Sequence, residues 1–135
     1  LDNVLLVTAS SGVNSGLSGL FTKLADEKVN LDVISQSPSG GGVSFTASMD
    51  SEDDITRVLA EMGLAYNIKR DNCKVSIVGN AMRTHPGVAA TAFKAFSDNN
   101  LPFYQVSTSE ISISFIVDTD NKQQAVQALV QAFGL

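Results

Sequence analysis

The sequence contains one pattern of hydrophobic residues twice, and this duplication restricts the chain to a fold of two similar units. In each copy an extended apolar run leads through a loop into a helical stripe, two more extended runs and a second helical stripe. The first stripes correspond at one constant spacing: Leu17, Leu20, Phe21 and Leu24 recur as Ala89, Ala92, Phe93 and Phe96. Shared periodicity in a single helix could arise by chance. Agreement through four elements in order indicates a tandem duplication.

The alternation and spacing of apolar residues predict the elements of each copy. For the first copy we expect strands at 4–7, 31–35, 43–47 and 66–69, with helical stripes at 17–24 and 55–62. For the second we expect strands at 75–78 and 111–115, an extended run ending at 107, and helical stripes at 89–96 and 126–133. Ser51 and Asp54 resemble a helix-capping pair, and 38–42 reads as a glycine-rich hairpin loop. Asp71 and Asn72 are expected to end the first copy.

Composition excludes several classes of protein. With 44% hydrophobic and 17% charged residues, the 135-residue chain can form a core, unlike a disordered tail. Its net charge of −5 argues against a nucleic-acid-binding groove, because such a groove must neutralise a row of phosphates. No apolar run is long enough to span a membrane. The single cysteine, Cys73, rules out an internal disulfide and fits a cytoplasmic location. Because the chain begins at Leu1 rather than Met, we expect a piece of something longer.

Three motifs in the second copy carry a family resemblance. They are KVSIVG, then MRTHPGVAA, then STSEISIS, all between Lys74 and Phe115. In this order they resemble the second regulatory ACT repeat of aspartate kinase, over roughly the last sixty residues. The resemblance implies an α+β fold of two ferredoxin-like βαββαβ ACT repeats, residues 1–70 and 71–135, each with an antiparallel sheet and helices on one face. The second copy has no fourth strand of its own, so either the fragment is cut short or the repeats are interlocked.

The resemblance also implies a function in amino-acid biosynthesis. It implies a regulatory region, or a separate regulatory subunit, that binds lysine or threonine and transmits feedback inhibition to the catalytic domain of aspartate kinase. The region would be a cytoplasmic homodimer. ATP and magnesium would belong to the kinase domain, and the chain itself would need no cofactor. We find no P-loop, no Ser-His-acid set and no paired carboxylates in a plausible cleft, and therefore assign no catalytic residues.

An effector site is expected where the first helix of each copy begins. Unpaired N–H groups and the partial positive charge of a helix N-terminus favour a carboxylate, and glycine allows close approach to the backbone. The first-copy effector-binding residues are expected to be Ser15, Gly16, Leu17, Leu31, Asp32, Gln36 and Ser37. A second-copy site or interface would include Arg83, His85, Gly87, Val88, Thr108, Ser109 and Glu110. Related lysine-inhibited kinases use an acid and a serine at the positions of Asp32 and Ser37, and period two would turn Asp32 away from the face of Leu31 and Val33.

Other interpretations remain open for these residues. Serine, glycine and asparagine are common in ordinary loops, and a lone histidine without cysteine or clustered acids argues against a metal site. The first loop also lacks the family's Asp-x-Pro-Gly, having Gly12-Val13-Asn14-Ser15 instead. Pro102, where the second extended run begins, should weaken binding by the second copy. An acylphosphatase-like small enzyme, with Asn80 and Arg83 as anion ligands, and a purely structural dimerisation module are the alternatives.

Overall fold

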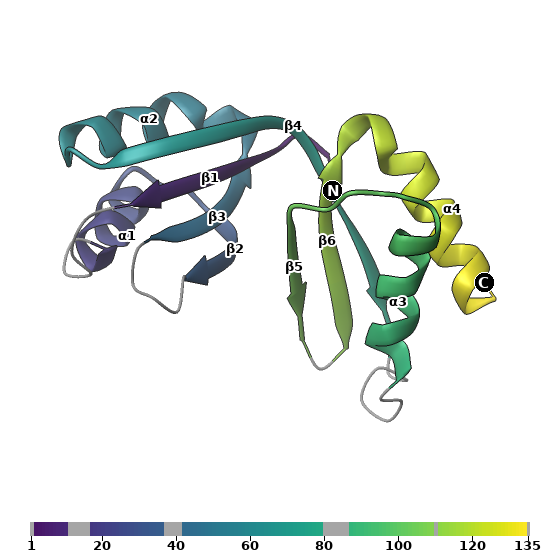
Figure 1. The fold of residues 1–135 in the computed structure, drawn as a ribbon. Coiled ribbons are helices and arrows are strands. Elements are labelled where there is room, and N and C mark those ends of the chain that lie inside the picture. The colour runs from purple at the N-terminus through teal and green to yellow at the C-terminus, as the bar shows by residue number, and fades with distance from the viewer. Residues whose placement is uncertain (1, 11–16, 37–41, 80–86, 110, 135) are drawn as a thin grey trace. The chain divides into compact units, whose positions relative to one another are not determined.

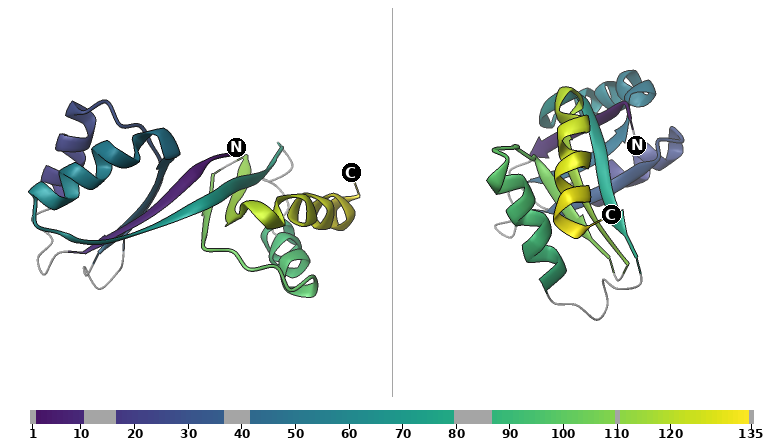
Figure 2. Two further views of the ribbon diagram at one scale, coloured as in Figure 1. Left: turned by 90° about the horizontal axis from the view of Figure 1, so that it is seen from above. Right: turned by 90° about the vertical axis from the view of Figure 1, so that its right-hand side faces the viewer.

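The computed structural model describes residues 2–10, 17–36, 42–79, 87–109 and 111–134. The chain forms two compact units (Figure 1). The first unit is Asn3–Asp71, and the second is Asn72–Leu135 together with Leu1–Asp2. In each unit antiparallel strands carry two helices on one face, as the views of Figure 2 also show. This is the ferredoxin-like α+β arrangement expected for an ACT repeat.

The first unit contains four strands and two α-helices in the order β1, α1, β2, β3, α2 and the beginning of β4. Their bounds are β1 Val4–Ser10, α1 Leu17–Asp26, β2 Leu31–Gln36, β3 Val43–Ser48, α2 Glu52–Glu61 and β4 Ala65–Val78. The sheet order is β2-β3-β1-β4, and β3 pairs antiparallel with both β1 and β2. The predicted strands and helical stripes are therefore confirmed in kind and order.

Alternating residues of this sheet form the core of the first unit. Val7 lies opposite Phe45 in the β1–β3 ladder, and both side chains are fully buried. The helices contribute the rest of the core from the stripes seen in the sequence: Leu20, Leu24, Ile55, Val58 and Leu59. Burial of such side chains, roughly 1.5–3 kcal/mol each, is what fixes the register of the strands.

The start of α2 differs from the sequence prediction. Ser51 occupies the N-cap position but makes no side-chain capping bond, so the predicted pairing with Asp54 is wrong. A short 3₁₀ turn, Met49–Ser51, precedes the helix, and Ser48 caps that turn by accepting a hydrogen bond from the N–H of Asp50 at 3.3 Å. The cap thus lies three residues earlier than expected because the turn and the helix are continuous.

The second unit repeats this arrangement with fewer described strands. It contains the end of β4, α3 (Gly87–Asp98), β5 (Gln105–Thr108), β6 (Ser112–Asp118) and α4 (Lys122–Phe133). Here the strand order is β4-β6-β5, and β6 pairs antiparallel with both neighbours. Pro102 precedes β5 by three residues, so the strand begins later than the extended run expected from the sequence.

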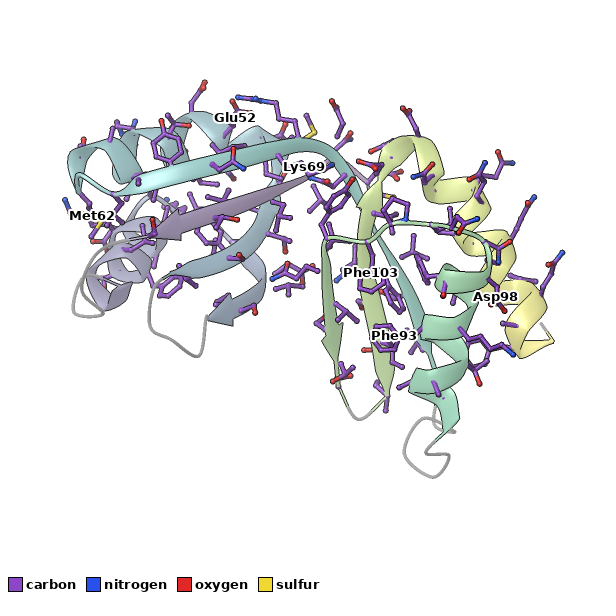
Figure 3. All side chains as sticks on the ribbon, in the orientation of Figure 1. Glu52, Met62, Lys69, Phe93, Asp98 and Phe103 are labelled. Atoms are coloured by element: carbon purple, nitrogen blue, oxygen red, sulfur yellow. The ribbon has the colours of Figure 1, made fainter. Side chains whose placement is uncertain are left out.

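Four phenylalanines form the centre of the second core. Phe96 and Phe115 are fully buried and stack with ring centroids 4.2 Å apart. Phe103 packs against both of these rings, Phe93 packs against Phe115, and the Phe93 and Phe103 rings lie 5.7 Å apart (Figure 3). Both outer rings remain more than one third exposed. The cluster therefore extends from the centre of the second core to its surface.

β4 is one long strand that takes part in both units. The sequence predicted two strands, 66–69 and 75–78, separated at Asp71 and Asn72; the structure joins them into one element. Asp71 has φ 62°, a left-handed conformation that is uncommon for a non-glycine residue. Short polar side chains such as that of aspartate tolerate this conformation better than most. The unit boundary thus falls at an irregular residue within a strand rather than at a loop.

Candidate functional site

The ends of β1 and β2 lie at the same end of the first sheet. Val43 of β3 is the partner of Ala9 on one side and of Gln36 on the other. The ends of β1 and β2 therefore lie on either side of the beginning of β3. Gly42 stands at this corner, and a Cβ there would lie 2.8 Å from the carbonyl oxygen of Ala9. Only glycine allows the two backbones to approach so closely, which leaves this corner lined by main-chain groups.

Asp32 lies at a β-bulge on the outermost strand of the first unit. Leu31 pairs with Ala47 and Ile34 pairs with Phe45, so β2 has one residue more than β3 between these pairs. The N–H of Val33 donates to the hydroxyl of Thr46 at 2.9 Å instead of continuing the ladder. The register pairs Leu31 and Ile34 with the buried residues Ala47 and Phe45, yet Ile34 itself is 54% exposed. Asp32 is exposed, whereas its neighbours Leu31 and Val33 are half-buried.

The other first-copy candidates are distributed along the same strand and the start of α1. Leu17 is the first residue of α1, Leu31 packs against the first core, and Gln36 is the last residue of β2. Ser15, Gly16 and Ser37 lie outside the described residues. Asp32 and Gln36 are four residues apart on an extended strand, which separates their Cα atoms by roughly 13 Å. A single small ligand would therefore contact both only if the ligand were elongated.

The second unit has a corresponding corner. Ile113 of β6 pairs with Ile77 and with Thr108, so the ends of β4 and β5 also lie side by side across β6. Gly87 begins α3 and is exposed, whereas Val88 packs partly against the second core. Arg83, His85 and Glu110 lie outside the described residues.

Ser109 is committed to the turn between β5 and β6. Its N–H donates to the carbonyl oxygen of Ser112 at 2.8 Å, and the two hydroxyls are also 2.8 Å apart. The same hydroxyl accepts a hydrogen bond from the N–H of Ile111 at 3.3 Å. Its hydrogen-bonding capacity is largely used within the hairpin, which favours a structural role over ligand binding.

A further cleft lies between α2 and the first part of β4. It has a volume of about 550 Å³ and includes Arg57 and Arg70. Arg70 donates to both carboxylate oxygens of Glu52, at 2.8 and 2.5 Å, and holds the pKa of Glu52 below its usual value. Arg57 pairs with Glu27 at 2.7 Å and with Asp54 at 3.2 Å. These exposed pairs balance the charge, so the cleft offers no excess of positive charge for an anion.

Two residues of the first unit were not identified from the sequence. Gly42, at the corner, belongs to a run of glycines that indicated only a loop, and Thr46, opposite the bulge, is a fully buried polar residue. A threonine between Phe45 and Ala47 was the available signal, because a buried hydroxyl needs a partner.

Metal and thiol chemistry receive no support from the part of the chain that the structure describes. Within it, no group of three or more histidine, cysteine, aspartate or glutamate residues could hold a metal ion. Cys73 is fully buried, and burial raises the pKa of its thiol, which favours the inert protonated form. Likewise, none of the described helices is long and apolar enough to cross a membrane.

Comparisons with known proteins agree with this fold over both units. Residues 75–133 match the ACT domain family. Aspartokinase 2 of Bacillus subtilis (strain 168) is 37% identical over 134 residues, which cover 92% of this chain and 33% of that protein. The chain therefore spans about a third of the length of this curated relative.

Solved structures resemble almost the whole chain. A structure of aspartokinase alpha and beta subunits superimposes with a TM-score of 0.88 at 27% identity, covering 98% of this chain and 94% of the other. The ligand-free regulatory subunit of aspartate kinase from Thermus thermophilus gives a TM-score of 0.86 at 26% identity, covering 96% and 93%. These likenesses extend from the first unit through the second.

Proposed function

Because the chain is a tandem ACT-domain regulatory region of the aspartokinase family, we propose that it binds an amino acid and controls a catalytic kinase domain. The effector would be lysine or threonine, and its binding would inhibit the ATP-dependent phosphorylation of L-aspartate. The chain would contribute no reacting group to that chemistry. ATP and magnesium would bind to the kinase domain, and this chain would shift the equilibrium between active and inactive kinase states.

The observation that carries this proposal is the extent of the structural match. A match to one ACT repeat alone would fit many proteins, since one fold supports many functions. Here both units, in the same order, match regulatory subunits of aspartate kinase over more than nine tenths of either chain. The function is therefore drawn from a tandem arrangement rather than from a single common fold.

The geometry of β2 favours lysine over threonine as the effector. The Cα atoms of Asp32 and Gln36 are separated by roughly 13 Å along the strand. A lysine could place its α-carboxylate at the N-terminus of α1 and extend its side-chain ammonium towards Asp32. Threonine is too short to reach both. Aspartokinase III of Escherichia coli was solved in complex with lysine and aspartate, although its 22% identity to this chain establishes a shared fold alone.

A thermal-shift screen of the chain against the twenty amino acids tests the proposal. An effector at a hundred times its dissociation constant should stabilise the chain by about 2.7 kcal/mol, which is readily visible as a higher melting temperature. We expect lysine to give the largest shift, with D-lysine and the lysine analogue lacking the α-carboxylate as controls. Equal melting temperatures with every amino acid would contradict the sensor function and support a structural dimerisation module.

We also propose that the chain is a homodimer joined through edge strands. β2 and β5 are the terminal strands of the sheet order, and each lies beside exposed apolar side chains. Ile34 is an exposed apolar residue of β2, while in the second unit Phe103, shortly before β5, and Phe93 of α3 are exposed. Open strand edges and exposed apolar groups together favour pairing with a second copy. Sedimentation velocity at tens of micromolar, as an order of magnitude, should give a dimer, and a monomer there would contradict the proposal.

A further inference from the structure

The chain passes between its two units at two places. The first lies between Asp2, which belongs to the second unit, and Asn3, which begins the first. The second lies between Asp71 and Asn72, inside β4 (Figure 1). Because the backbone connects the units at these two places, its torsions there determine how one unit can turn relative to the other.

A residue in the left-handed conformation stands at each crossing: Asn3 with φ 58° and Asp71 with φ 62°. Lys28 and Asn100 are the other described non-glycine residues of this kind, with φ 61° and 53°. Each of them follows a helix, and its N–H bonds back to that helix, which is the usual left-handed helix end. No described helix ends at Asn3 or Asp71. What these two residues share is instead their position at a unit boundary.

At the second crossing, the two neighbours of Asp71 are held in different units. Arg70 donates to both carboxylate oxygens of Glu52 in the first unit, at 2.8 and 2.5 Å. Asn72 lies opposite Asp118 in the β4–β6 ladder of the second unit. Asp71 therefore stands between an anchor in the first unit and an anchor in the second.

The first crossing has the same construction. The carboxylate of Asp2 accepts a hydrogen bond from Nζ of Lys122 in the second unit at 2.7 Å. The carbonyl oxygen of Asn3 accepts one from the N–H of Met49 in the first unit at 2.9 Å. Each of these interactions lies within one unit. A change of backbone torsion at Asn3 or Asp71 therefore turns one unit relative to the other while the anchors on both sides stay intact.

We propose that Asn3 and Asp71 form a paired hinge about which the two units turn as rigid bodies. Two connections leave rotation about the line through both residues as the motion that disturbs the units least. Asparagine and aspartate suit this role, because they adopt the left-handed conformation more readily than other residues with a side chain and also accept an extended backbone. Both side chains are exposed, so the motion breaks no core contact. The hinge is a property of the chain alone and does not depend on whether the chain senses an amino acid.

Distances between spin labels on the two units test the proposal. The labels are attached at Glu61→Cys in α2 and Gln127→Cys in α4, both exposed positions, while the fully buried Cys73 is left in place. Pulsed electron paramagnetic resonance then gives the distribution of distances between the units. An excess of unlabelled chain ensures that the distances measured lie within one copy. Labels at Lys23→Cys and Glu61→Cys, both in the first unit, provide the reference width for a rigid body.

The Asn3→Val/Asp71→Val double variant should shift the distribution between the units. A β-branched side chain strongly disfavours the left-handed conformation and favours an extended backbone at both crossings. We expect the mean distance to change by more than the reference width measured within the first unit. Asn3→Gly/Asp71→Gly should instead broaden the distribution between the units, because glycine accepts both conformations without strain. If the valine variant does not fold, the glycine variant decides alone, and an unchanged distribution there would overturn the proposal.

The Lys28→Val/Asn100→Val double variant is the matched control. It makes the same substitution at two residues with the same conformation, but within the units rather than between them. We expect it to lower the melting temperature, because a helix end cannot relax by turning a unit, and to leave the distances between the units unchanged. Valine at the two crossings should lower the melting temperature less. The hinge is refuted if the control shifts the distances as much as the Asn3→Val/Asp71→Val variant does, or if neither hinge variant changes them.

Discussion

The Phe96→Ala variant is expected to lose about 3–5 kcal/mol of the free energy of unfolding of the second unit. Phe96 is fully buried and stacks on Phe115 at 4.2 Å, and both rings also contact Phe103. Removing the ring leaves a cavity among rigid neighbours that cannot all move inward. The stacked geometry adds about 0.5–1.5 kcal/mol beyond the lost burial.

Two matched variants give this prediction its controls. Phe103→Ala removes a ring from the same cluster where it is more than one third exposed, so its cost should be clearly smaller. Phe45→Ala removes a fully buried ring from the first core, where Phe21 is an aromatic neighbour at 6.4 Å. Denaturant titrations with hydrogen exchange followed separately in each unit measure all three. The interpretation fails if Phe96→Ala weakens protection in the first unit as much as in the second.

The Asp32→Asn variant is expected to bind the effector roughly ten- to hundredfold more weakly than the original chain. The proposed lysine places its side-chain ammonium against this carboxylate, and a covered ammonium requires an anionic partner. Asparagine keeps nearly the same shape but loses the charge-assisted hydrogen bond. Asp32 is exposed in a bulge and does not contribute to the core, so the variant should fold normally.

Calorimetric titration with lysine separates this prediction from a structural role. Asp50→Asn is the control, because Asp50 is another exposed aspartate of the first unit that lies in the turn before α2 rather than on β2. We expect the control to bind lysine as the original chain does. Identical dissociation constants for Asp32→Asn and the original chain would rule out the carboxylate of Asp32 as a ligand.

Much of the fold was predictable because burial repeats with the period of each element. The residues that alternate in 43–47 and those that recur along 55–62 are the ones that the two-layer arrangement buries. The bulge at Asp32 was not predictable in this way, since it depends on the register with β3 rather than on the residues of β2. The continuity of β4 was also missed, because Asp71 and Asn72 are residues typical of turns.

The candidate site was less accessible to sequence reasoning than the fold. Side chains that form a core are selected for a shared property, whereas a ligand site needs a few groups from distant segments in one place. The register at Val43 brings the ends of β1 and β2 together, which the sequence could suggest only by analogy between the copies. The roles of Asp32 and Gln36 in binding stay predictions until a ligand is measured.

The left-handed conformation of Asp71 has a further consequence, for the solubility of the chain. A straight strand of 14 residues with a free edge in each unit would be a long template for intermolecular aggregation. Asp71 interrupts the regular extended backbone near its middle, and Lys69 and Arg70 place charge just before the interruption. Each remaining edge of β4 is then short. In the first unit, the charged side chains of Lys69 and Arg70 also oppose pairing of that edge with another chain. We therefore expect the irregular residue at the unit boundary to limit edge-to-edge pairing between folded chains.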